Sequence, residues 1–129
     1  MLTQLCYASV ASAPLPPPAL QQLLDKARAN NERDGITGLL LYGNGHFVQV
    51  LEGDDTNVSA LYARILKDSR HRQVFELYRE PVTTRDFRTW TMAFDHLAEF
   101  KPDFLLDRSS ARMLVELFLE KERTLTLGS

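Results

Sequence analysis

A central hairpin constrains the fold of this 129-residue chain more than any other feature. Residues 36–42 are almost continuously apolar, as expected for a strand that is covered on both faces. The Gly-Asn-Gly sequence at 43–45 is a strong signal for a tight turn between two antiparallel strands. Residues 46–52 form the returning strand, whose two-residue period places Phe47 and Gln49 on one side. Two adjacent strands of a sheet are therefore predicted here.

Other predicted elements flank this hairpin on both sides. Helices are recognised by apolar residues at a spacing of three and four, and strands by short apolar or alternating runs between turn residues. The predicted elements, in chain order, are a strand over 3–9, a helix that follows the prolines at 14–18 and ends near 34–35, the two hairpin strands, a helix whose apolar stripe covers 58–66, and strands over 73–78 and 88–94.

This βαββαββ order predicts an α+β fold, a ferredoxin-like sheet with two helices packed on one face. Right-handed crossovers would place the first and third strands side by side at the centre of the sheet. Tyr7 of the first strand and Gln49 of the third then become neighbours on one face. The first helix would bring Asn31 towards them, because Asn31 extends its apolar face by one turn.

The C-terminal part of the chain differs in character from the rest. We divide the sequence into a domain over 1–96 and a helical extension over 97–129. The extension contains a predicted helix from Ser109 to about Arg123 with one apolar face. That face would either cover the open side of the sheet or dock onto another chain.

Composition excludes several functional classes. A formal net charge of −2 argues against nucleic-acid binding, which needs a basic surface. The three histidines and the single Cys6 show no metal-ligand spacing, and Cys6 is expected to be a small buried hydrophobe. No apolar run approaches the roughly 20 residues that cross a bilayer, and no secretory signal is visible. We therefore expect a soluble, cytoplasmic protein without bound metal.

Three polar residues occupy positions that would otherwise be apolar. Tyr7 and Gln49 sit within apolar strands, and Asn31 lies on the apolar face of a helix. A buried polar group without a partner costs roughly 1–3 kcal/mol, so each of these side chains needs a partner. Taken singly, they could be a core tyrosine, an edge amide and a helix cap. Taken together, they indicate one planar heteroaromatic ligand held at one site.

Residues 1–96 resemble a BLUF domain, the family of blue-light sensors that use FAD. The resemblance covers four blocks with matching order and spacing, which read LCYAS at 5–9, NNERDGITGLL at 30–40, FVQVLEG at 47–53 and FRTWTMAF at 87–94. Because the chain ends soon after the last block, it is similar to the short members of that family.

The resemblance implies a set of photoactive residues around one flavin. Tyr7 would donate an electron to the photoexcited flavin, and Gln49 would lie between Tyr7 and the flavin ring. Asn31 would bind the edge of the ring, with Asn30 nearby. The remaining photoactive positions implied by the resemblance are Ser9, Trp90 and Met92, which would border the glutamine network or relay its rearrangement.

The resemblance also implies further contacts with FAD. Ile36 and Ile65 would flank the ring, while Arg64, Arg70 and His71 would lie on the ribose and phosphate side. The implied mechanism is light-driven electron and proton transfer from Tyr7, which rearranges the hydrogen bonds of Gln49.

A chain of this kind would signal to another protein and would not be an enzyme. A downstream protein partner and a homo-oligomer are both expected from the resemblance, with the C-terminal helix as the contact surface. Two alternatives remain open: a flavin-binding protein that does not respond to light, and a small ferredoxin-like hydrolase.

Overall fold

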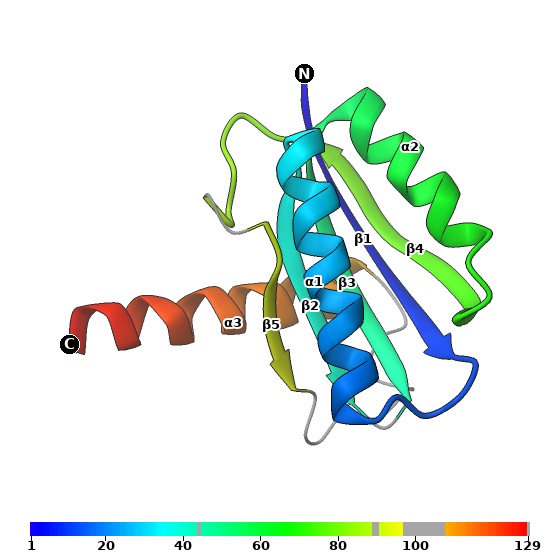
Figure 1. Cartoon of the computed structure of the whole chain (residues 1–129). Helices are drawn as coiled ribbons and strands as arrows, with labels where there is room; N and C mark the ends of the chain where they lie inside the picture. Colours follow the sequence, from blue (N-terminus) through cyan, green and yellow to red (C-terminus); the bar gives the residue numbers. More distant parts are fainter. Residues whose placement is uncertain (44, 89–90, 97–107, 129) are drawn as a thin grey trace.

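The computed structural model describes residues 1–43, 45–88, 91–96 and 108–128, which form one sheet flanked by helices (Figure 1). The elements are β1 (Leu2–Ala11), α1 (Pro17–Asp34), β2 (Thr37–Gly43), β3 (His46–Asp54), α2 (Asp55–Leu66), β4 (His71–Pro81), β5 (Ala93–His96) and α3 (Arg108–Gly128). The five strands lie in the order β4-β1-β3-β2-β5, so β1 and β3 are central neighbours as the crossover argument predicts. All pairs are antiparallel except β2 with β5.

Helices α1 and α2 cover one face of the sheet, as the ferredoxin-like prediction requires (Figure 1). Leu24 of α1 and Val58 of α2 pack there against Leu5, Leu40 and Leu51 of the strands. α1 ends at Gly35, whose φ of 67° is the left-handed conformation that glycine adopts easily. The chain can therefore turn directly from α1 into β2.

Helix α3 crosses the opposite face of the sheet (Figure 1). Its residues Ala111, Val115 and Phe118 are buried against the sheet, where they meet Leu39 and Val50. The apolar face predicted for the C-terminal helix thus covers the open side of the sheet within the same chain. The near-continuous apolar character of β2 follows, because side chains on both of its faces are buried.

The prediction of a fifth strand over 88–94 is wrong in its bounds. β5 comprises Ala93–His96, and the φ of 54° at Arg88 is incompatible with a strand. The first pair between β2 and β5 joins Leu39 to Ala93, so the strand can begin only there. Trp90, predicted within this strand, lies outside the described residues.

β4 is longer than the predicted strand over 73–78. It is an edge strand with register shifts against β1, and Gln73 takes a φ of 50° at one of them. Its exposed, largely polar sequence gives little apolar signal, which explains the underestimated length.

A buried carboxylate organises the face of the sheet under α3. The side chain of Glu52 on β3 is fully buried and accepts hydrogen bonds from Nε2 of Gln4 at 3.0 Å and Oγ1 of Thr37 at 2.8 Å. It also accepts from the main-chain N–H groups of Asp86 and Phe87, at 3.0 Å and 2.8 Å. The segment after β4 is therefore tied to β3 through main-chain hydrogen bonds.

Arg112 connects α3 to the same network. Its guanidinium donates to Oε1 of Gln4 at 2.8 Å and to Oδ2 of Asp86 at 3.0 Å. The hydroxyl of Tyr78 also donates to Oε1 of Gln4, at 2.7 Å. α3 is thus held to the sheet by polar contacts as well as by its apolar face.

Candidate functional site

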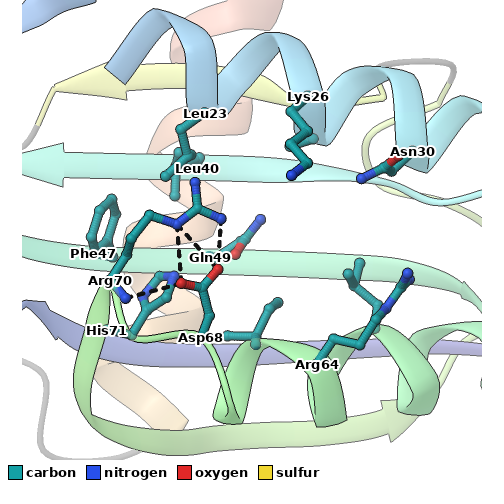
Figure 2. A pocket seen from close by; sticks show the side chains of 13 residues that line it. Leu23, Lys26, Asn30, Leu40, Phe47, Gln49, Arg64, Asp68, Arg70 and His71 are labelled. Carbon is teal, nitrogen blue, oxygen red and sulfur yellow. Dashed lines mark hydrogen bonds and ion pairs between the residues drawn. The ribbon is translucent and has the colours of Figure 1, made fainter. Parts of the chain in front are cut away.

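A cleft of about 270 Å³ opens between α1 and α2 above the central strands (Figure 2). Its walls are mainly apolar, and its polar groups lie at the floor and the rim. The residues that line it are Leu23, Lys26, Ala27 and Asn30 of α1, Leu40 of β2, Phe47 and Gln49 of β3, Leu61, Arg64 and Ile65 of α2, Asp68 and Arg70 of the following turn, and His71 of β4.

Gln49 lies at the floor of this cleft and is hydrogen-bonded from below. Tyr7 and Gln49 occupy directly opposite positions of β1 and β3, and the Tyr7 hydroxyl donates to Oε1 of Gln49. Nε2 of Gln49 in turn contacts Sδ of Met92 at 3.7 Å. Tyr7 has no exposed surface and Gln49 is 8% exposed. The structure thus brings together Tyr7, Gln49 and Met92, three of the residues that the sequence singled out.

Burial strengthens the preference of Tyr7 for its neutral form. Loss of solvent raises the pKa of the Tyr7 phenol well above its usual range, and the nearby Tyr62 raises it further. The phenol therefore stays neutral at physiological pH and keeps its proton for the hydrogen bond to Gln49.

Ser9 and His71 form a second polar pair at the end of the cleft. Oγ of Ser9 lies 2.8 Å from Nδ1 of His71, so the hydroxyl of Ser9 is hydrogen-bonded to the imidazole. The His71 ring packs against Tyr7 and Phe47, with centroid distances of 6.1 Å and 4.9 Å. Burial lowers the pKa of His71, which favours a neutral imidazole at pH 7.

Asn31 and Ile36 lie close to the cleft without lining it. Asn31 is 2% exposed, and its Nδ2 donates to the carbonyl oxygen of Thr91 at 2.8 Å. Ile36 belongs to the apolar core beneath the helices. Of the residues that the resemblance assigns to the cofactor, those that do line the cleft are Asn30, Gln49, Arg64, Ile65, Arg70 and His71.

Charged side chains gather at the rim of the cleft. Arg70 forms an ion pair with Asp68 at 2.6 Å, and this contact lowers the pKa of Asp68 to about 2. Arg64 pairs with Asp34 at 3.5 Å. Lys26 points into the cleft from α1 (Figure 2) and was not among the predicted residues. Its helical spacing to Leu23 and Asn30 could have revealed it, because residues three or four apart share a face.

Two classes of site are not found in the parts of the chain that the structure describes. No three histidine, cysteine, aspartate or glutamate side chains within residues 1–43, 45–88, 91–96 and 108–128 gather where they could hold a metal ion. None of the described helices is long and apolar enough to span a bilayer.

Comparison with known proteins relates this geometry to a family. The family model of BLUF, described as sensors of blue-light using FAD, matches residues 2–93. The photoactivated adenylate cyclase subunit beta of Euglena gracilis is 38% identical over an alignment of 105 residues, which covers 78% of this chain and 12% of that protein. The blue light- and temperature-regulated antirepressor BluF of Escherichia coli (strain K12) is 33% identical over 87 residues, or 67% of this chain and 22% of that protein.

A solved structure agrees with the fold as well. The ground state of BlsA superposes with a TM-score of 0.80 at 28% identity, covering 92% of this chain and 88% of that one. The chain spans less than a quarter of the two curated relatives, and the cyclase named in the first belongs to that longer protein. The chain therefore belongs to the BLUF family, described as sensors of blue-light using FAD.

Proposed function

We propose that this chain binds FAD non-covalently in the cleft between α1 and α2 and acts as a blue-light photoreceptor. The observation that carries the proposal is the buried hydrogen bond from Tyr7 to Gln49 directly under the floor of the cleft. A neutral phenol joined to a rotatable amide is a suitable source of one electron and one proton.

The lining of the cleft fits a flavin. Apolar side chains such as Leu40 and Ile65 can cover the faces of a planar ring, while the amides of Gln49 and Asn30 offer donors and acceptors to its edge. Lys26 and Arg64 at the rim suit the negative charge of phosphate groups. A volume of about 270 Å³ suits one ring system with its remaining groups directed towards the rim.

The bound flavin would supply the absorption of blue light and the site that accepts an electron. Tyr7 would give up an electron together with the proton of its hydroxyl, and Oε1 of Gln49 is the first acceptor in reach. Recombination would return both to Tyr7, so no net oxidation occurs. During this cycle the Gln49 amide would exchange its donor and acceptor ends by rotation or tautomerisation.

Met92 links this change to the edge of the sheet. The contact between its sulfur and Nε2 of Gln49 depends on which end of the amide faces it, because a thioether only accepts hydrogen bonds. Met92 directly precedes β5, so a change at Gln49 would reach that strand. Asn31 would add a second contact to the ring edge, and Trp90 would border the same network.

The signal would pass to another protein, and the chain would also self-associate. The relatives named above couple light to a cyclase or to an antirepressor. On α3, Met113 and Leu117 are more than half exposed and lie on one helical stripe, which supports an apolar contact surface. Sedimentation velocity on Leu117→Glu tests this part, since the charge should shift an oligomer towards the monomer.

The visible absorption spectrum of the purified protein, taken in the dark and after blue light, tests the central proposal. A flavin spectrum with a small reversible red shift, and release of FAD on denaturation, is the expected result. A flavin spectrum without a shift would reduce the chain to a light-inert flavin binder. A colourless protein with phosphatase turnover would favour the hydrolase and overturn the proposal.

A further inference from the structure

Two side chains of α1 hold the backbone immediately before β5. Nε of Arg28 donates to the carbonyl oxygen of Met92 at 3.1 Å, and Nδ2 of Asn31 donates to that of Thr91 at 2.8 Å. Residues three apart on a helix lie on one face, so both donors approach from the same side. α1 therefore grips two successive carbonyl groups of a single segment.

These carbonyl groups lie just outside the sheet. The pairing of β5 with β2 begins at Ala93, opposite Leu39, so Thr91 and Met92 precede the ladder. A backbone carbonyl removed from water needs a hydrogen-bond donor wherever it lies. At Thr91 and Met92 the donors are side chains of α1, whereas from Ala93 onwards the main chain pairs with β2.

The position of Met92 matters because its contact with Gln49 is weak. The sulfur lies 3.7 Å from Nε2 of Gln49, and a thioether is a poor acceptor on a side chain with three rotatable bonds. Burial in the core and the pairing of β5 from Ala93 onwards place this segment. The hydrogen bond from Arg28 additionally fixes the Met92 carbonyl, and with it the main chain that carries the sulfur towards Gln49.

We propose that Arg28 is a positioning residue for the photocycle, which fixes Met92 against Gln49 through the Met92 carbonyl. This inference rests on the proposed function for its effect on the light response. Arg28 lies outside the set of described residues that line the cleft, so it acts through Met92 and not by touching the ligand. It also differs from Asn31 in having no role implied by the family resemblance.

The test compares three variants of the full chain. Arg28→Met removes the donor and keeps an unbranched apolar stem of good helix propensity, whereas Arg28→Lys keeps a cationic donor. Arg33→Met is the matched control, because Arg33 lies on the same helix, has a side chain that is 63% exposed and forms an ion pair with the adjacent Asp34. Each substitution is also made in a Met92→Leu background.

Two readouts are measured. The first is the rate of dark recovery after blue light, together with the size of the red shift. The second is the NMR signal of the ¹³C-labelled methionine methyl group of Met92 in the dark, which does not depend on photochemistry. Apart from Met92, the wild-type chain contains only Met1 and Met113. Arg28→Met and Arg33→Met each add one methionine, so in every variant the Met92 signal is assigned as the one that disappears in the Met92→Leu background.

We expect Arg28→Met to slow dark recovery by about threefold or more, because the dark-state network loses a contact. The Met92 methyl signal should shift in the same variant, and Arg28→Lys should restore both values towards wild type. Arg33→Met should change neither. In the Met92→Leu background, Arg28→Met should have no further effect on recovery, since coupled residues are non-additive.

An unshifted methyl signal in Arg28→Met would overturn the inference, and so would a full-size kinetic effect in the Met92→Leu background. If Arg28→Met does not fold, Arg28→Gln removes the charge and shortens the donor, and the same criteria apply to it. A wild-type protein without a red shift would refute the proposed function, while the methyl signal would still decide whether Arg28 positions Met92.

Discussion

The hydroxyl of Tyr7 donates to Oε1 of Gln49 across the β1–β3 pair, so the side chains of the two central strands are hydrogen-bonded on the face that α1 and α2 cover. Both residues face α1 and α2, and the bond lies between the core and the floor of the cleft. A change in either partner is therefore expected to alter the polarity of the floor while the sheet keeps its backbone pairing.

Replacing Tyr7 by phenylalanine should abolish the red shift while flavin binding persists. The ring still fills its site, but the proton and the accessible electron of the phenol are lost. The free energy of unfolding should fall by only about 1 kcal/mol, as for a single hydrogen bond. Light-minus-dark difference spectra and chemical denaturation measure the two effects.

Tyr62→Phe is the control for this change, because its ring lies 5.6 Å from that of Tyr7 without bonding Gln49. Its red shift should match wild type. A normal red shift in Tyr7→Phe would show that another residue is the electron donor.

Replacing Arg112 by methionine should weaken the attachment of α3. The change removes the hydrogen bonds of the guanidinium to Gln4 and Asp86 and its ion pair with Glu116, while the apolar stem stays similar. We expect the free energy of unfolding to fall by about 1–2 kcal/mol. The loss is smaller than for a fully buried charged group, because the Arg112 side chain is 34% exposed and water screens its contacts. Urea denaturation followed by circular dichroism measures the loss.

Glu116→Gln provides the comparison for Arg112. It removes an exposed ion pair between Glu116 and the same arginine and should cost less than about 0.5 kcal/mol. Because Arg112→Met removes this ion pair as well, equal losses in the two variants would mean that the contacts with Gln4 and Asp86 contribute nothing measurable.

Replacing Gly38 by alanine should disrupt the central hairpin. A Cβ atom at Gly38 would lie 2.0 Å from the carbonyl oxygen of Val50, a main-chain atom of β3 that cannot move without separating the strands. We expect the free energy of unfolding of Gly38→Ala to fall by about 3 kcal/mol or more, or the variant not to fold. At Gly45 nothing lies within 4 Å of the place that an alanine methyl group would take, and only the φ of 76° opposes alanine, at about 1–2 kcal/mol. Thermal unfolding of both variants should rank Gly38→Ala as the more damaging, and the reverse order would contradict the close approach.

The thiol of Cys6 should be inert in the folded protein. Cys6 is fully buried, and burial raises its pKa to about 12, so the reactive thiolate is scarce at pH 8. Labelling of Cys6 with a disulfide reagent should be slow in buffer and fast in denaturant. In buffer the labelling rate should be limited by how often the protein opens to expose the thiol. Equally fast labelling in both conditions would show that β1 is accessible from the α3 side.

Local sequence patterns predict most of the fold, because the hairpin turn at 43–45 and the helix end at Gly35 depend on glycine and on residue spacing. The start of β5 was not predictable in this way, since it depends on where β2 offers a partner to Ala93. The strand patterns and the right-handed crossovers predict Tyr7 and Gln49 as neighbours on one face, whereas their hydrogen bond depends on the exact register of β1 and β3. The network of Glu52 and Arg112 leaves no local signal, because its members come from distant parts of the chain.

The short length of β5 has a consequence for where the molecule opens first. β3 pairs along its length with β1 and β2, whereas β5 is joined to β2 alone through four residues at the edge of the sheet. Free energies of local opening rise with such pairing, so amide protons of β5 should exchange with solvent far sooner than those of β3. The strand that follows Met92 can therefore detach with a free energy that is a small fraction of that of global unfolding, while the central strands stay paired.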